Sequence, residues 1–135
     1  MATISFDELI ARKEQREADK LRIGALKIPD SDRTLEAKMP APSIVMSIYG
    51  AMCAAESAEQ MVVVARKALY SVAPQLQDSK LHEALGCTDE PIRVIDQMFT
   101  VAEIDIIGGQ ALQFMGLLSD GKSTAQDTGL ETVKN

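Results

Sequence analysis

The stretch that decides the fold is TVAEIDIIGGQALQFMGLL, Thr100 to Leu118, near the end of a 135-residue chain. Thr100 and Glu103 have the spacing of a capping box, in which the two side chains bond each other's backbone amides where a helix begins. Apolar residues then recur every three or four positions, which predicts an amphipathic helix. Its apolar stripe consists of Ile104, Ile107, Ala111, Met115 and Leu118.

Two glycines, Gly108 and Gly109, stand in the middle of this expected helix. Each costs on the order of 1 kcal/mol of helix stability relative to alanine. A second helix that crosses at close range would offset that cost, and a bend in the helix is the alternative. The pair is no phosphate loop, because neither GxGxxG nor GxxxxGK[ST] occurs in the chain.

Four shorter helical patterns precede this one. Each combines a capping residue with apolar residues at helical spacing. The third ends at Gly86, where a glycine and the following Cys87 suit a Schellman ending. The four patterns begin after Ser43, after Ser57, after Asp78 or Ser79, and at Thr88.

A hairpin is expected in LRIGALKIPDSDRTLEAKM, residues 21–39. Apolar residues alternate in both halves, and Pro29 to Asp32 supplies turn chemistry between them. A two-stranded ribbon is marginal alone in water. Its apolar face therefore lies on the helices, or its free edge associates with another chain. The alternating apolar residues are Leu21, Ile23 and Ala25 in the first half and Leu35, Ala37 and Met39 in the second.

The ends of the chain differ from its middle. Residues 1–20 predict a charged N-terminal helix or arm, with a capping box at Ser5 and Glu8 and a small apolar patch of Phe6, Leu9 and Ile10. Residues 119–135 have no periodicity and are expected to be disordered. Residues 21–118 then form one domain, mainly α within the α+β class, whose hairpin 21–39 packs on about five helices.

The charge of the chain excludes some functions. The net charge is −6, and residues 41–135 hold twelve acidic against six basic residues. No stripe of Lys and Arg is present, so nucleic-acid binding is not expected. No run of about 20 apolar residues is present either, which argues against a membrane span. The first residues lack the apolar run of a signal peptide, so we expect a cytosolic protein. Cys53 and Cys87 are interpreted as small buried hydrophobic residues, with a disulfide as the less favoured alternative.

No catalytic signature is apparent. His82 is expected on an exposed helix surface, and a thiol dyad of Cys87 with His82 is the rival hypothesis. Asp89, Glu90 and Glu103 lie in first turns of expected helices, where negative charge complements the helix dipole. No metal-ligand spacing occurs. We therefore expect a non-enzymatic binding protein with no cofactor, metal or catalytic residue.

The stretch from Tyr70 to Leu117 resembles the tail assembly chaperones of bacteriophages, in particular the XkdN-like group. The opening at residues 88–91 and the glycine pair depart from the family pattern, which puts the local helix geometry there in question. The features that carry the resemblance are Tyr70, Pro74, Leu76, Asp78, Leu81, Gly86, Met98, Phe99, Glu103 and Gly116.

This resemblance implies a protein made in the cytoplasm of the infected or lysogenic host bacterium and absent from the mature virion. Its client would be the tape measure protein, with the tail tube protein as a further partner, and a homo-oligomer stays open. The alternative is a small phage or bacterial adaptor that binds a partner helix. The residues expected to contact a partner are Phe6, Leu9, Ile10, Leu21, Ile23 and Leu35.

Overall fold

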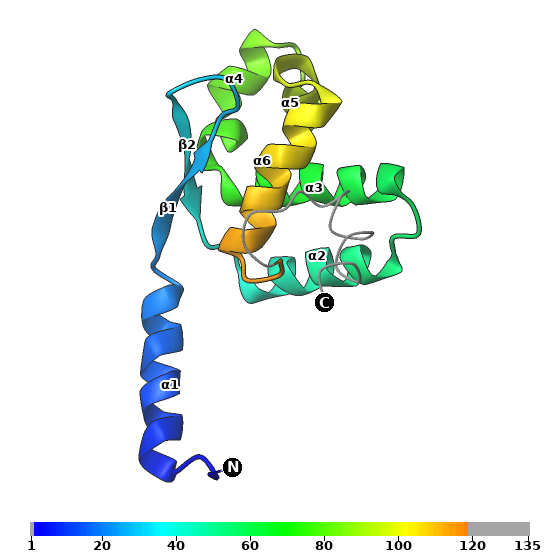
Figure 1. Cartoon of the computed structure of the whole chain (residues 1–135). Helices are drawn as coiled ribbons and strands as arrows, with labels where there is room; N and C mark the ends of the chain where they lie inside the picture. The colour runs from blue at the N-terminus through cyan, green and yellow to red at the C-terminus, as the bar shows by residue number, and fades with distance from the viewer. Residues whose placement is uncertain (1, 119–135) are drawn as a thin grey trace.

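The centre of the computed structural model, which describes residues 2–118, is the crossing of helices α3 (Ala58–Val72) and α6 (Val101–Phe114) (Figure 1). Gly108 lies against Ala65 at this crossing. A Cβ atom on Gly108 would lie 2.5 Å from both the Cβ and the carbonyl oxygen of Ala65, so no side chain fits there. Of the two explanations for the central glycines, the close helix crossing is the right one for Gly108.

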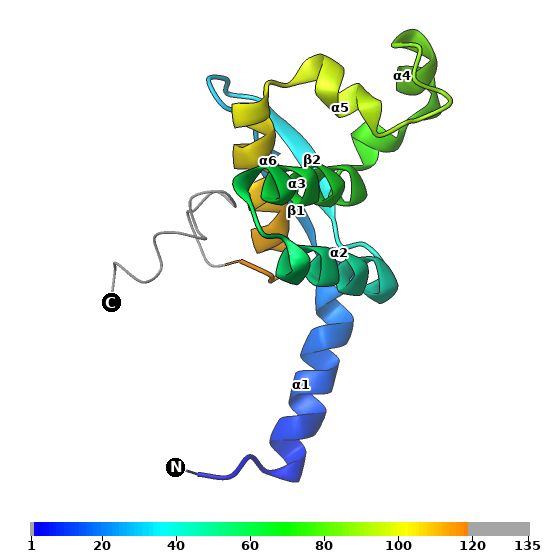
Figure 2. The same ribbon diagram turned by 90° about the vertical axis from the view of Figure 1, so that its right-hand side faces the viewer.

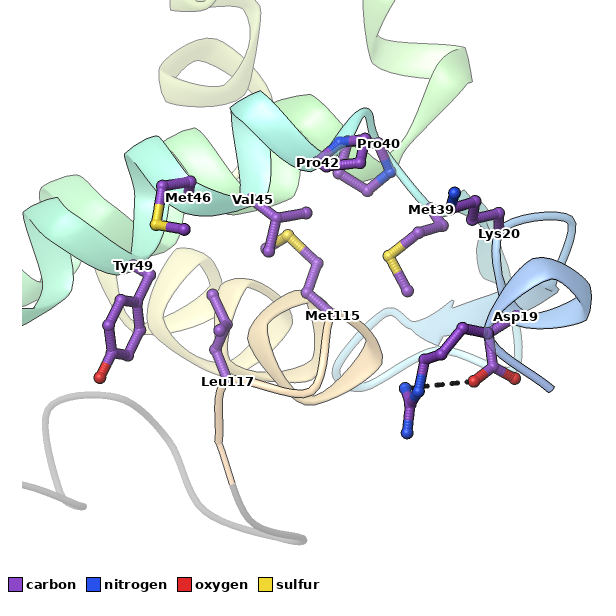
Figure 3. Close-up of a pocket in the computed structure, with 11 residues that line it drawn as sticks. Asp19, Lys20, Met39, Pro40, Pro42, Val45, Met46, Tyr49, Met115 and Leu117 are labelled. Atoms are coloured by element: carbon purple, nitrogen blue, oxygen red, sulfur yellow. Dashed lines mark ion pairs between the residues drawn. The ribbon is translucent and has the colours of Figure 1, made fainter. Parts of the chain in front are cut away.

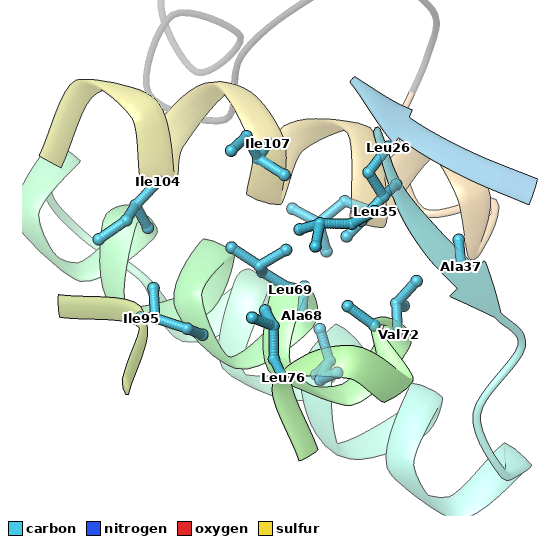
Figure 4. Packing of buried hydrophobic residues seen from close by; sticks show 14 of the residues in the cluster. Leu26, Leu35, Ala37, Ala68, Leu69, Val72, Leu76, Ile95, Ile104 and Ile107 are labelled. Atoms are coloured by element: carbon cyan, nitrogen blue, oxygen red, sulfur yellow. The ribbon is translucent and has the colours of Figure 1, made fainter. Parts of the chain in front are cut away.

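A single apolar core surrounds the crossing. Both strands, α2 (Pro42–Ala54), α3, α5 (Arg93–Met98), α6 and the short 3₁₀ helix η1 (Pro74–Gln77) contribute to it. In Figure 4 the side chains of the hairpin, α3 and α6 point toward one another across the core. Its largest fully buried members are Leu26, Leu69, Val72, Leu76, Cys87, Val94, Ile95, Ile107 and Leu112.

The hairpin pairs strand β1 (Ile23–Lys27) antiparallel with strand β2 (Thr34–Lys38). Leu35 and Ala37 face the core, as the alternation in β2 predicts, and their partners in β1 are Leu26 and Gly24. The prediction for β1 is wrong by one residue, because Leu21 and Ile23 are 81% and 64% exposed.

The ring of Phe114 fixes which face of β1 is buried. A Cβ atom on Gly24 would lie 2.8 Å from a carbon of this ring, so only glycine lets the strand approach α6 so closely. The guanidinium of Arg22 lies 4.5 Å from the centre of the same ring and donates a hydrogen bond to the Phe114 carbonyl. These contacts turn Ile23 outward.

Glutamine side chains cover part of both outer edges of the hairpin. The Gln110 amide accepts a hydrogen bond from the Lys27 N–H at 2.7 Å and donates one to the Lys27 carbonyl at 2.9 Å. On the other edge, Gln75 accepts from the Glu36 N–H at 2.8 Å. The hairpin is thus tied to α6 and η1 by the same kind of bond that a further strand would make.

Helix α1 (Phe6–Asp19) projects from the body as a rod, with the N-terminal end far from the core (Figures 1 and 2). Its predicted capping box is present, because Glu8 N–H donates to Ser5 Oγ and Ser5 N–H donates to Glu8 Oε1. None of its residues is buried. The disorder expected for residues 119–135 concerns residues outside those the structure describes.

The remaining helices follow the predicted order with two shifted starts. Helix α2 begins at Pro42, and Ala41 rather than Ser43 occupies its N-cap. Helix α5 begins at Arg93 rather than near Thr88, because a proline disfavours helical geometry in the residue before it, here Glu90.

Helix α4 (Ser79–Ala84) ends at Gly86 in the predicted Schellman motif. Gly86 has a φ of 69°, its N–H donates to the Glu83 carbonyl, and the Cys87 N–H donates to the His82 carbonyl. The mainly helical fold with one N-terminal hairpin is therefore confirmed.

Replacement of Gly108 by alanine tests the crossing. Gly108→Ala forces α3 and α6 apart and should destabilise the protein by about 1–3 kcal/mol or more. Gly50→Ala is the matched control, because Gly50 lies in helix α2 with nothing within 4 Å of the added Cβ. This control should stabilise the protein by about 0.5–1 kcal/mol. Urea denaturation of both variants measures the difference, and equal effects would contradict the close crossing.

A second prediction concerns the edge of the hairpin. Gln110→Ala removes two hydrogen bonds to Lys27 and should destabilise the protein by about 1–2 kcal/mol in total. Amide hydrogen exchange at Lys27 should accelerate, while exchange at Glu36 stays unchanged. Gln75→Ala is the reciprocal control and should accelerate Glu36 alone. Equal acceleration at both amides in both variants would mean that the hairpin opens as one unit.

Candidate functional site

Helix α2 carries an apolar surface that the rest of the described protein leaves largely uncovered. No charged residue occurs between Lys38 and Glu56, so all faces of this helix are uncharged. A helix that is apolar all round is normally buried on all sides. Only Ile48 among the 13 residues of α2 is buried. Ile44, Met46 and Tyr49 are exposed, which makes α2 the prime candidate for contact with another protein.

An apolar hollow of about 470 Å³, here called the α2 groove, lies along one flank of this helix (Figure 3). Apolar and aromatic side chains from three parts of the chain form its walls, and the base of α1 forms a charged rim. The apolar lining consists of Met39, Pro40, Pro42, Val45, Met46, Tyr49, Met115 and Leu117, and the rim of Arg16, Asp19 and Lys20.

Local backbone chemistry puts these residues together. Pro40 and Pro42 end the second strand and start α2, because proline fixes φ and fits the first turn of a helix. Gly116, with a φ of 84°, ends α6 in a Schellman motif. Its N–H donates to the Gln113 carbonyl at 2.9 Å, and the Leu117 N–H donates to the Leu112 carbonyl at 2.8 Å. This turn places Leu117 in the wall of the groove.

The opposite flank of α2 is also hollowed. Two depressions of about 500 Å³ and 230 Å³ lie between α2 and the α3 region. Ile44, Tyr70 and Ser71 line both of them, so the two depressions adjoin. Burial raises the pKa of Tyr70. Helix α2 thus stands as a ridge between two hollows, a shape that offers side chains of a partner several places to insert.

The charged groups of the α2 groove lie at its rim. At the rim, Arg16 and Asp19 form an ion pair at 3.2 Å, and Lys20 lies 3.6 Å from Glu17. On α2 itself, a hydrogen bond with Cys53, and then the electrostatic interaction with that side chain, raise the pKa of Tyr49. Cys53 is exposed, so the prediction that it is buried is wrong.

The partner-contact residues expected from the sequence lie elsewhere. Phe6, Leu9 and Ile10 are exposed near the free end of α1, and Leu21 and Ile23 are exposed beside the hairpin. Leu35 is different, because it is only 9% exposed and belongs to the core, so it is not accessible to a partner. The structure does not bring these residues together with the α2 groove of the same chain. The signal that could have found α2 is the charge-free run between Lys38 and Glu56.

The expected exposure of His82 is also wrong. This residue is 6% exposed, its Nε2 lies 2.8 Å from the Leu76 carbonyl oxygen, and its ring stacks on Tyr70. Cys87 is buried as predicted, and its sulfur contacts Gln97 Nε2 at 2.9 Å. The His82 ring therefore bonds the Leu76 carbonyl and the Cys87 sulfur bonds Gln97, so each side chain has a structural partner other than the one in the hypothesised dyad.

The described residues hold neither a cluster of metal ligands nor a membrane-spanning helix. In residues 2–118, no group of three or more His, Cys, Asp or Glu side chains is placed to hold a metal ion. Within the same range, no helix has the length and apolar character needed to cross a bilayer.

No protein-family model, no curated protein and no solved structure matches this chain. What the site does is therefore inferred from its own shape and chemistry. An uncharged ridge and an apolar groove fit the side chains of another protein better than a polar metabolite.

A pH titration tests the helix cap at the free end of α1, remote from the α2 groove. The hydrogen bond from the Ser5 N–H, and then that with the Ser5 hydroxyl, lower the pKa of Glu8 below 4.5. Because the folded pKa is depressed, the cap stabilises the start of α1 fully above pH 4.5 and is lost as the pH falls through the folded pKa. NMR titration of the Glu8 side chain measures its pKa. The chemical shifts of residues Phe6 to Ile10, followed over the same pH range, measure the loss of helix at the start of α1.

The control for this titration is Ser5→Ala. It should raise the pKa of Glu8 part of the way toward 4.5, because it removes the Ser5 hydroxyl and leaves the Ser5 N–H, the larger cause of the lowered pKa, in place. A Glu8 that titrates at the same pH with and without the serine hydroxyl would contradict the contribution of that hydroxyl.

Proposed function

We propose that this protein is a phage tail assembly chaperone that binds apolar helices of the tape measure protein through α2 and the α2 groove. The observation that carries the proposal is the uncharged helix α2, which has one buried residue and a groove beside it. The resemblance of residues 70–117 to the tail chaperones supports the same function and names the client.

A long helical client presents apolar stripes before the tail tube encloses it. Such a stripe can lie along a groove with its side chains at positions i, i+3, i+4 and i+7 as anchors. Methionine suits this task, because its unbranched thioether side chain adapts to different partners. Met39, Met46 and Met115 all line the α2 groove. The surface can therefore accept successive segments of a client whose sequence varies.

The charge distribution favours reversible binding. The chain has a net charge of −6, which keeps the free protein soluble while α2 stays exposed. The apolar surface is modest in area, and modest interfaces form transient complexes. The proposal includes action in the host cytoplasm, release before the virion is complete, the tail tube protein as a further partner, and no bond-making chemistry.

Paired charge insertions test the proposal. Met46→Glu places a carboxylate in the groove, while Val101→Glu places one on a surface remote from it, and the two native side chains are 69% and 66% exposed. Burial of an unpaired carboxylate against an apolar client is unfavourable, so Met46→Glu should weaken binding more than about tenfold. Val101→Glu should bind as the native chain does.

The assay is co-expression with a helical segment of the tape measure protein, followed by pull-down and titration calorimetry. If Met46→Glu binds the client as tightly as the native chain does, the client binds at a surface other than the α2 groove. Absence of binding by the native chain would contradict the chaperone function itself and would favour a small adaptor with a different partner helix.

A further inference from the structure

Helix α1 is the part of the molecule that the proposed function leaves unused. It has 14 residues, and none of them is buried. A helix of fewer than about 12–15 residues is marginal in water when nothing packs against it. Phe6 near its free end is 74% exposed, and Ile4, Leu9 and Ile10 close to it are exposed too. The free end of α1 is therefore a second apolar surface without a partner in the described chain.

One face of α1 connects this apolar end to the α2 groove. Residues separated by three or four positions share a helix face, so Phe6 and Leu9 lie on the same face as Arg16 and Lys20. Arg16 and Lys20 line the rim of the groove. The face that is apolar at the free end of the helix thus borders the groove at its base.

The helix cannot fill the groove of its own chain. A helix rises 1.5 Å per residue, so Phe6 lies about 21 Å from Lys20 along a straight axis. Figures 1 and 2 agree that α1 runs away from the body. An occupant with the chemistry of the free end of α1 has to come from a different molecule.

We infer that α1 of one copy occupies the α2 groove of a second copy, and that α1 of the second copy occupies the α2 groove of the first. Two α1 helices lie antiparallel beside each other in this arrangement, so the free end of each meets the base of the other. Every chain carries one apolar end and one apolar groove, and a two-fold axis satisfies both at once. Phe6, Leu9 and Ile10 of each copy then contact Met39, Met115 and the other apolar lining residues of its partner.

Charge and side-chain chemistry agree with the antiparallel direction. The first turn of α1 carries Asp7 and Glu8, whereas Arg16 and Lys20 lie at the base. Antiparallel pairing brings Asp7 and Glu8 of each copy to the mixed-charge base of the other, where Arg16 and Lys20 lie beside Asp19 and Glu17, whereas parallel pairing brings acid to acid. Surface ion pairs contribute little, so the apolar contact carries the association, and only the antiparallel direction brings each apolar end to a groove. Methionine sulfur against the Phe6 ring adds a favourable contact.

This inference goes beyond the proposed function and does not depend on it, since it concerns the protein without a client. In the absence of a client, self-association covers the apolar surface of the groove.

Complementation between two variants of the full chain tests the exchange. Phe6→Glu damages the end of α1 and keeps the groove, whereas Met46→Glu damages the groove and keeps the end of α1. Each variant alone loses both contacts of the dimer, so its dissociation constant should rise more than about tenfold. An equimolar mixture forms a dimer with one intact contact, whose affinity should lie between that of the native protein and that of either variant.

Sedimentation velocity over a range of concentrations measures these equilibria, and Val101→Glu is the control that should match the native chain. Circular dichroism checks folding, which both substitutions should spare because both side chains are exposed. If Phe6→Glu does not fold, Leu9→Glu replaces it.

A native chain that stays monomeric, a dimer indifferent to Phe6→Glu, a ring of more than two copies, or a mixture that fails to associate would each overturn the reciprocal exchange. No client is present in the experiment, so its outcome is independent of the test of the proposed function.

Discussion

The close approach of α3 and α6 at Gly108 is the contact on which the rest of the structure depends. Without a side chain at this position, the α6 backbone reaches Ala65, and the apolar stripes of both helices meet along their length. A second glycine permits a close approach between the hairpin and α6, because Gly24 lies under the ring of Phe114. Gly108 and Gly24, which lack a Cβ, therefore set how closely α3 and β1 approach α6.

This arrangement also explains why the rest of residues 2–118 leaves most of α2 uncovered. Helix α3 packs against both α6 and α2. Because α6 and the hairpin fill the interior, α2 contacts the body with one face and buries only Ile48. Its exposed faces carry no charged residue, and the end of α6 turns at Gly116 to add Leu117 beside them. The exposed surface is thus a consequence of helix order and not of a special binding motif.

Most of the local chemistry was predictable from the sequence, apart from the starts of α2 and α5, whereas long-range orientation was not. The capping boxes at Ser5 and Thr100 and the Gly86 ending depend on neighbours within a few residues, and all three are present. The face of β1 depends on Phe114, about ninety residues further along the chain, so alternation alone selected the wrong side. His82 is buried because its ring meets the Leu76 carbonyl and stacks on Tyr70, contacts that helical periodicity does not reveal. The candidate site escaped prediction because an apolar stripe normally indicates burial, and only the packed structure reveals which stripes lack a cover.

The glutamine bonds at the hairpin edges bear on how the nascent chain folds. Gln110 and Lys27 are separated by 83 residues, so the ribosome has released most of the chain before the two can meet. Until then the β1 edge stays open and the ribbon lacks the surface of α6 on which Gly24 packs, although Gln75 of η1 can already bond the other edge. The last helix therefore completes the first strand.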